Sequence, residues 1–376
     1  MSITRFSFPT TIHFGPGARK LVGEQLRELG LKRPLIVTDR GLAALPVLAE
    51  FRQHLATGLD TGLYSGVHGN PTASQVVQGV AAFRAHRADC VVGFGGGAAL
   101  DIAKVVAAMA VHDGDVIEYA WDHPQVKPLV NPLPPFFALP TTSGTGSEVG
   151  RSSVVSEDAT HVKRVVFSPK LLARAVFADP ELTFGLPPAV TAATGMDALT
   201  HNIESYLSPA YHPLCDGIAL EGVRIAARAL PVAVRDGRDL QARSDMMMAS
   251  MMGAIAFQKD LGAVHSCAHA LGAVCDLHHG LANALMLDPV MRFNADAVPA
   301  KFAELAHVAG LGSGDFVPWL ARLKKEIGIA PSLAAAGVKR EQFPRLVELA
   351  VKDVCHQTNP RPCTAADFER FFEQAY

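Results

Sequence analysis

The stretch Cys90-Val91-Val92-Gly93-Phe94-Gly95-Gly96-Gly97-Ala98 decides the fold of the first half of the chain. Its apolar start is typical of a strand covered on both faces, as in a parallel sheet. Three glycines follow, and a helical pattern over residues 99–111 begins directly after them. Glycines let a pyrophosphate approach the backbone of such a turn, and the free N–H groups at a helix start attract it. The pattern predicts a strand, a turn and a helix that bind a nucleotide phosphate, with an ordinary tight turn as the alternative.

Similar apolar runs occur on both sides of this stretch, up to about residue 185, at residues 35–39, 136–139 and 175–178. Helical stretches alternate with them, which predicts a doubly wound α/β layer with a parallel sheet and right-handed crossovers. From Pro187 onward the strand-like runs disappear, and apolar residues recur with the period of a helix. We therefore expect a dinucleotide-binding α/β domain over residues 1–186 and an all-helical, metal-binding catalytic domain over residues 187–376.

Composition excludes several classes of function. The chain has 376 residues, with 34 basic and 36 acidic side chains, so its formal net charge is -2. Such a balance argues against a broad surface for nucleic acids or anionic membranes. No run reaches the roughly 18 uncharged apolar residues of a membrane-spanning helix, and residues 1–15 lack a signal-peptide pattern. The six cysteines are dispersed, which argues against a disulfide framework and against a cysteine zinc site. We expect a soluble cytoplasmic protein with no nucleic-acid and no membrane partner.

Two further features of the predicted sheet suit a nucleotide. In a Rossmann fold an acidic residue usually ends the next strand, about 20 residues after the glycine-rich turn, and this chain lacks it. Asp39, at the end of an earlier apolar run, is the better candidate for the carboxylate that binds the ribose. A carboxylate there can accept both ribose hydroxyls of an adenosine and repel a 2′-phosphate, which favours NAD over NADP; an ordinary strand-end aspartate is the alternative. The loop at residues 140–148, rich in hydroxyl side chains, follows another predicted strand at the end where open α/β sheets bind ligands.

Histidines and an aspartate in the second half have the spacing of metal ligands. Asp197 and His201 are four residues apart on one predicted helix, so they project from the same face. Further candidates fall within one short window: His265, His269, His278 and His279. Imidazoles with one carboxylate suit Fe(II), Zn(II) or a similar ion better than magnesium or calcium. Spacing alone nominates His265 and His269 as a helical pair and leaves His279, at a helix start, as an open alternative.

Taken together, these motifs resemble the iron-containing (group III) alcohol dehydrogenase family along almost the whole chain. The matching segments are residues 70–72, 95–104, 141–148, 179–183, 195–201 and 279–284. The resemblance implies a two-domain fold that binds a nucleotide and a metal ion in the cleft, and a homo-oligomer of two or more subunits.

The resemblance also implies a role for individual residues. The metal ligands would be Asp197, His201, His265 and His279, with His269 close to the metal but not ligating. The implied cofactor contacts are Asp39 and Asn70 near the adenosine, Gly96, Gly97 and Ala98 at the pyrophosphate, Thr141, Thr142 and Thr145 along the diphosphate and nicotinamide, and Lys163 at a ribose. The chain departs from the family at Ala98, where members usually carry serine. One hydroxyl contact to a phosphate is thereby lost.

The function implied is hydride transfer between NAD(H) and a small primary alcohol or aldehyde, with Fe(II) or Zn(II) as a Lewis acid on the substrate oxygen. His269 is a candidate proton relay, with a packing role as the alternative. Arg151 and Lys259 are cations near presumed site segments, and they could hold a substrate carboxylate, as in 4-hydroxybutyrate and its semialdehyde. The alternatives are a surface position for Arg151 and, for Lys259, pairing with Asp260 or capping of a helix. A lyase like dehydroquinate synthase, which uses NAD transiently, and a non-enzymatic metal or nucleotide-binding protein are the competing functions.

Overall fold

The computed structural model describes residue 8 and residues 10–55, 57–312 and 314–376, which form two compact units. Of these described residues, the N-terminal unit comprises residues 10–55, 57–142 and 147–183. The C-terminal unit comprises residue 8 and residues 143–146, 184–312 and 314–376. Among the described helices, none combines the length and the apolar character needed to cross a bilayer.

A six-stranded sheet forms the centre of the N-terminal unit, and all its strands are parallel. In spatial order the strands are β1 (Thr11–Phe14), β8 (Ala175–Ala178), β5 (Phe136–Pro140), β4 (Cys90–Gly95), β2 (Pro34–Asp39) and β3 (Gly62–Val67). The register places Val92 of β4 beside Ile36 of β2 and Phe137 of β5. The four inner strands are the four apolar runs of the sequence, so the predicted parallel α/β layer is confirmed.

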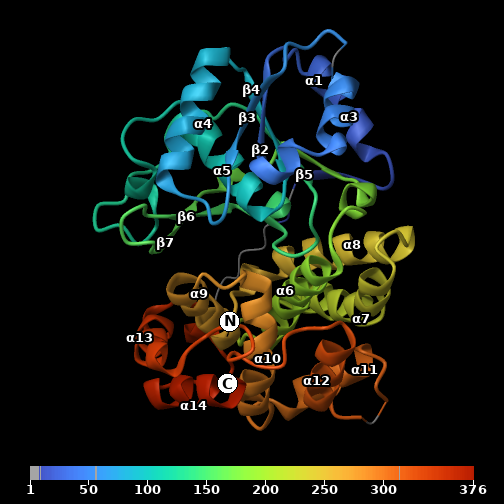
Figure 1. The fold of residues 1–376 in the computed structure, drawn as a ribbon, viewed down its shortest axis with the longest axis vertical. Helices are drawn as coiled ribbons and strands as arrows, with labels where there is room; N and C mark the ends of the chain where they lie inside the picture. Colours follow the sequence, from blue (N-terminus) through green and yellow to red (C-terminus); the bar gives the residue numbers. More distant parts are fainter. Residues whose placement is uncertain (1–7, 9, 56, 313) are drawn as a thin grey trace. The chain divides into compact units, whose positions relative to one another are not determined.

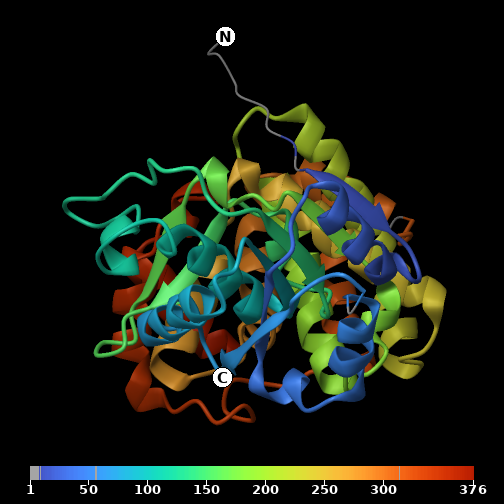
Figure 2. The same cartoon turned by 90° about the horizontal axis from the view of Figure 1, so that it is seen from above.

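Helices cover both faces of this sheet (Figures 1 and 2). They are α1 (Val22–Glu28), α2 (Arg40–Ala43), α3 (Pro46–Leu55), α4 (Ala73–His86) and α5 (Gly97–Met109). On one face α1 and α3 form an apolar core with the strands, in which the ring of Phe51 stacks on that of Phe94 with centroids 4.9 Å apart. On the other face α5 lies so close to β4 that a Cβ on Gly93 would come within 3.0 Å of Leu100 and Ala103.

A separate antiparallel hairpin, β6 (Ser152–Ser156) with β7 (Lys163–Phe167), completes the N-terminal unit. The sequence did not predict this hairpin, nor the edge strands β1 and β3. All of these are partly exposed and therefore lack a continuous apolar run.

Helices and short 3-10 turns, without a strand among the described residues, make up the C-terminal unit. The helices are α6 (Pro188–Leu207), α7 (Pro213–Arg235), α8 (Leu240–Ala256), α9 (Ala263–Cys275), α10 (His279–Ala295), α11 (Pro299–Val308), α12 (Phe316–Glu326), α13 (Phe343–Lys352) and α14 (Ala365–Ala375). The predicted all-helical second half is confirmed, although α13 and α14 were not predicted. Almost all of α6 is buried, because α7, α8 and α10 pack around it.

Candidate metal centre and nucleotide loops

Three neighbouring helices of the C-terminal unit carry the predicted metal ligands (Figure 1). Asp197 and His201 lie one turn apart on α6, as their spacing predicted. His265 lies in the first turn of α9, and His279 is the first residue of α10. Three of these residues are buried and His279 is partly exposed.

A close contact between α10 and α6 brings His279 to this place. Gly280 follows His279 directly, and a Cβ at this position would lie 2.1 Å from the carbonyl oxygen of Ala193 and 3.3 Å from the Cβ of Asp197. Only a residue without a side chain lets the two helices approach so closely. The glycine therefore allows a residue of α10 to join a site that is otherwise built from α6 and α9.

The candidate ligand atoms converge on one point. The Oδ1 atom of Asp197 lies 3.4 Å from Nε2 of His279 and 3.8 Å from Nε2 of both His201 and His265. The four ligand atoms all lie within 4.8 Å of one another. Around a tetrahedral zinc ion the donor atoms stand about 3.4 Å apart, because each lies about 2.1 Å from the metal. The donor set and its spacing thus fit a divalent ion such as iron or zinc.

Burial prepares the imidazoles for ligation. Both His201 and His265 lie inside the unit, and this burial lowers the pKa of each imidazole to about 4. Their rings are therefore neutral at neutral pH, which is the form that binds a metal.

Two polar residues that were not predicted from the sequence contact the ligands. Glu204 on α6 has its carboxylate 2.6 Å from Nδ1 of His265, and burial raises the pKa of this glutamate to about 7. Asn283 on α10 donates its side-chain N–H to Oδ1 of Asp197 over 2.7 Å. Helical spacing could have identified both, because Glu204 lies two turns after Asp197 and Asn283 lies one turn after His279.

His269, the candidate proton relay, lies beside the ligand cluster. Its ring stacks on that of His279 with centroids 5.5 Å apart, and its Nδ1 atom lies 2.8 Å from Oδ2 of Asp353. Burial acts to raise the pKa of Asp353. The opposite effect is larger: the charge of His269 and the hydrogen bonds from His269, Cys355 and Ser266 hold the pKa of Asp353 below its usual range. Asp353 therefore stays a carboxylate and holds one nitrogen of the His269 ring.

In the N-terminal unit, the predicted phosphate loops lie next to each other. The N–H of Thr141 donates to the carbonyl of Gly95 over 3.0 Å, and a Cβ on Gly96 would lie 3.2 Å from the side chain of Thr142. Helix α5 begins at Gly97, so Ala98 lies in its first turn, and no described side chain caps this helix start. The loops after β4 and β5 thus share the edge of the sheet at which ligands bind in open α/β folds.

Asp39 lies at the same edge. Its Oδ1 accepts the N–H of Leu42, which caps the short helix α2, and a Cβ on Gly95 would lie 3.6 Å from its Oδ2. The residue is thus both the strand-end cap that we named as the alternative and a neighbour of the glycine turn. Its carboxylate keeps free acceptor capacity for a ligand, because an ionised carboxylate offers about four acceptor positions.

The remaining predicted cofactor contacts occupy two other places. Asn70 precedes α4, and the carbonyl of the adjacent Pro71 accepts the N–H of Ser156, which pairs with Lys163 across the hairpin. Asn70 and Lys163 therefore belong to neighbouring segments of the N-terminal unit. Thr145 lies in the short segment of residues 143–146, which packs with the C-terminal unit.

A buried polar network connects α5 to the end of the loop at residues 140–148 and to β6. Asp101 accepts the hydroxyl of Ser147 over 2.5 Å and the N–H of Val154 over 2.9 Å. Lys104, which is fully buried, donates to the same Ser147 hydroxyl over 2.8 Å. Burial raises the pKa of the neighbouring Glu148 to about 7 and lowers that of Lys104. These residues belong to motifs that the sequence analysis quoted, but their contacts to one another could not be read from it.

The two cations that we expected at a substrate carboxylate lie in different units. The guanidinium of Arg151 lies over the ring of Phe167 in the N-terminal unit, 5.4 Å from the ring centroid. Lys259, in the C-terminal unit, is only 1% exposed, and its ammonium forms an ion pair with Asp216 of α7. Pairing with Asp260 was one of the alternatives for Lys259, and Asp216 takes that place. The ion pair gives this buried charge a structural partner, and a contact of Lys259 with a substrate stays a prediction.

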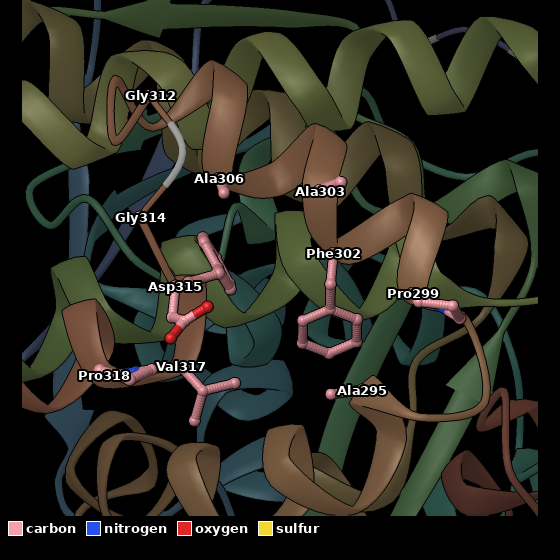
Figure 3. A pocket seen from close by; sticks show the side chains of 11 residues that line it. Ala295, Pro299, Phe302, Ala303, Ala306, Gly312, Gly314, Asp315, Val317 and Pro318 are labelled. Carbon is pink, nitrogen blue, oxygen red and sulfur yellow. The ribbon is translucent and has the colours of Figure 1, made fainter.

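The structure also contains a pocket between α11 and α12, of about 410 Å³ (Figure 3). Phe302, Ala303 and Ala306 of α11 line one side, and Asp315 and Val317 lie across from them. None of the predicted site residues lines this pocket. It is therefore distinct from the candidate metal centre.

Comparisons with known proteins agree with this arrangement. The family described as iron-containing alcohol dehydrogenase matches residues 9–180, and the C-terminal part of the Fe-containing alcohol dehydrogenase family matches residues 191–376. The chain is 39% identical to 4-hydroxybutyrate dehydrogenase of Cupriavidus necator, over 97% of this chain and 98% of that protein.

Solved structures that are similar over the whole length of this chain include an oxidoreductase and a reductase. The crystal structure of 1,3-propanediol oxidoreductase has a TM-score of 0.94 and 38% identity, and all of that chain is covered. Sulfoacetaldehyde reductase from Bifidobacterium kashiwanohense in complex with NAD+ has a TM-score of 0.90 and 27% identity, with 99% of that chain covered. The protein therefore belongs to the iron-containing alcohol dehydrogenase family and is an oxidoreductase that acts on a small alcohol or aldehyde.

Proposed function

We propose that the protein transfers a hydride between NAD(H) and a small primary alcohol or its aldehyde, and that it holds a divalent ion at Asp197, His201, His265 and His279. The observation that carries this proposal is the convergence of one carboxylate oxygen and three imidazole nitrogens within 4.8 Å. We propose Fe(II) as the ion, because the family is named for iron, with Zn(II) as the alternative that the same donor set accepts.

The donor set suits hydride chemistry. A divalent ion at this place supplies a Lewis acid that polarises a substrate oxygen. Since His201 and His265 are neutral at neutral pH, Asp197 contributes the only negative charge among these ligands. The residues therefore leave a net positive charge where negative charge builds up on the alcohol oxygen.

His269 is the group of this chain that we propose moves a proton. Asp353 holds its Nδ1 atom, so Nε2 is the ring nitrogen left to exchange a proton with the substrate side. Its side chain is 32% exposed, which gives a proton access to solvent. The alcohol direction releases a proton as well as a hydride, and a positioned histidine can carry that proton to water.

The loops of the N-terminal unit are the proposed NAD site. Gly96, Gly97 and Ala98 would hold the pyrophosphate through backbone N–H groups at the start of α5, and Thr141 and Thr142 lie beside them. Asp39 would take the adenosine ribose. The NAD+ complex of the related sulfoacetaldehyde reductase supports this cofactor. In the same proposal Asn70, Thr145 and Lys163 complete the cofactor contacts.

We propose that the substrate class includes ω-hydroxy acids and semialdehydes, with Arg151 as the partner of the acidic group. The relative from Cupriavidus necator is named for 4-hydroxybutyrate, and sulfoacetaldehyde also carries an acidic group. A guanidinium binds such a group through paired hydrogen bonds. The test compares kcat/KM for succinic semialdehyde with that for an uncharged aldehyde of equal length. The acid should be preferred, and Arg151→Ala should remove the preference.

The proposed activity itself is tested by following NADH absorbance with a panel of aldehydes, on protein of known metal content. Stoichiometric NADH consumption is expected, whereas a lyase of the dehydroquinate synthase type or a binding protein would show none. His279→Ala should remove both bound metal and turnover. Full metal content and full rate in this variant would contradict the ligand set.

We also propose that the protein is a cytoplasmic homo-oligomer of two or more subunits. Light scattering of the purified protein measures the number of subunits.

A further inference from the structure

We propose that Glu204 is the positioning residue that sets the metal affinity of the candidate centre, because it fixes the His265 ring in its ligating form. This inference rests on the proposed metal centre and concerns a residue that is not itself a ligand. Its carboxylate oxygen Oε2 lies 2.6 Å from Nδ1 of His265, and both side chains are only 1% exposed. In a site shielded from water, such a hydrogen bond decides which ring nitrogen carries the proton.

The contacts around His265 assign its proton to one ring nitrogen. The side-chain N–H₂ group of Asn283 is 2.7 Å from Oδ1 of Asp197, and it also lies 3.2 Å from Nε2 of His265 and 3.3 Å from Nε2 of His279. We place the proton of the neutral ring on Nδ1, because the carboxylate of Glu204 lies 2.6 Å from that nitrogen and the amide of Asn283 offers a donor on the Nε2 side. Nδ1–H therefore donates to Glu204, and the lone pair of Nε2 points to the place where the other ligand atoms converge.

Glu204 cannot turn away from this position. Its second oxygen, Oε1, accepts the N–H of Val264 over 2.8 Å. A Cβ on Gly262 would lie 2.6 Å from the same Oε1, so the chain before α9 closes directly over the carboxylate. Each oxygen thus has its own partner, and the glycine permits the close approach that holds both.

The chain offers a matched comparison one turn further along α9. His269 makes the same kind of contact, with its Nδ1 atom 2.8 Å from Oδ2 of Asp353. His269 is not among the four converging ligands; with Asp353 and Cys355 it forms a separate group whose ligand atoms also lie within 4.8 Å of one another. If a carboxylate at Nδ1 acts by setting the lone pair of a ligand, only the partner of His265 should affect metal binding at the four-ligand centre, which is the binding that His279→Ala removes. A general structural effect of removing a buried carboxylate would appear at both positions.

The variant Glu204→Gln reverses the hydrogen bond without changing the size of the side chain. Its amide oxygen keeps the N–H of Val264, which leaves the amide N–H₂ group facing Nδ1 of His265. The ring must then accept at Nδ1 and carry its proton on Nε2, so the lone pair for the metal is lost. Removing such an outer carboxylate typically weakens metal binding by about 10–100-fold.

The experiment measures the Zn²⁺ dissociation constant of the metal-free protein with a competing chelator. We expect Glu204→Gln to bind Zn²⁺ about 10–100-fold more weakly than wild type, whereas Asp353→Asn stays within about threefold. Circular dichroism and the Tm of the metal-free forms show that the variants are folded. Equal Zn²⁺ affinity in wild type and Glu204→Gln overturns the inference, and so does an equal loss in both carboxylate variants.

Gly262→Ala is the second variant, because its Cβ must displace Glu204 while the carboxylate itself stays. It should also weaken Zn²⁺ binding, and an unchanged dissociation constant in folded Gly262→Ala contradicts the inference even if Glu204→Gln does not fold. A different result would contradict the proposed function instead: wild-type protein that binds no Zn²⁺, or that binds it as tightly after His279→Ala.

Discussion

Gly280→Ala tests whether the approach of α10 to α6 builds the metal centre. The added Cβ would lie 2.1 Å from the carbonyl oxygen of Ala193, and contacts under 3.0 Å are essentially never seen, so the start of α10 must move by about 0.9 Å or more. Metal–ligand distances tolerate only about 0.2 Å. A displacement of this size therefore takes His279 out of reach of an ion that Asp197 holds. We expect kcat to fall by about 100-fold, as for other misplacements of about 1 Å.

The assay follows NADH oxidation with the best aldehyde substrate, together with the metal content after dialysis against a fixed concentration of free Zn²⁺. Gly217→Ala is the matched control, because this glycine is also helical, lies in α7 and has no described atom within 4 Å of the place that an added Cβ would take. It should keep the wild-type rate and metal content, with a stability unchanged or raised by up to about 1 kcal/mol. One bound ion per chain and a kcat within threefold of wild type in Gly280→Ala would refute the reasoning.

Two of the three further predictions concern residues that are not metal ligands, and the third concerns the metal ion. Lys259→Met should destabilise the protein by about 1–3 kcal/mol, because Asp216 loses the charge that compensates it. The preference for a semialdehyde over an uncharged aldehyde should stay the same in this variant, and loss of that preference would show that Lys259 contacts the substrate. Burial raises the pKa of Glu148 from 4.5 to about 7, so the stability that this group contributes is complete below pH 4.5 and is lost as the pH rises through 7. Glu148→Gln should therefore be more stable than wild type at pH 8 by up to about 3 kcal/mol and similar to it at pH 4.5 in urea denaturation, and the opposite pH trend would contradict this sign. Zn²⁺ at 100 times its dissociation constant should stabilise the metal-free protein by about 2.7 kcal/mol, and an unchanged Tm in calorimetry would show that the ion does not bind the folded state selectively.

The inner part of the sheet could be predicted because burial on both faces leaves a direct trace in the sequence. Strands β2, β4, β5 and β8 are buried along almost their whole length, which requires a continuous apolar run. Edge strand β1 is partly exposed, with Phe14 at 40%, and its four residues do not stand out from a loop. Helix α14 had a usable signal, since Thr364 and Asp367 form a capping box at its start.

The candidate centre could be predicted only as far as helical spacing reaches. Spacing pairs Asp197 with His201, but it cannot decide between His269, on the same helix as His265, and His279, on the next one. That choice depends on the contact of Gly280 with Ala193, which joins residues far apart in the sequence. The partner of Lys259 was missed for the same reason, because the ion pair with Asp216 spans two separate helices.

The placement of the four converging residues also has a consequence for the order of events during synthesis. Asp197 and His201 leave the ribosome before His279, which opens a helix that emerges only after α7, α8 and α9. A nascent chain therefore cannot offer all four ligands until about half of the segment 184–376 has been translated. Metal loading should follow the assembly of this unit, and shortage of the ion during growth should yield folded but empty protein that can be reconstituted afterwards.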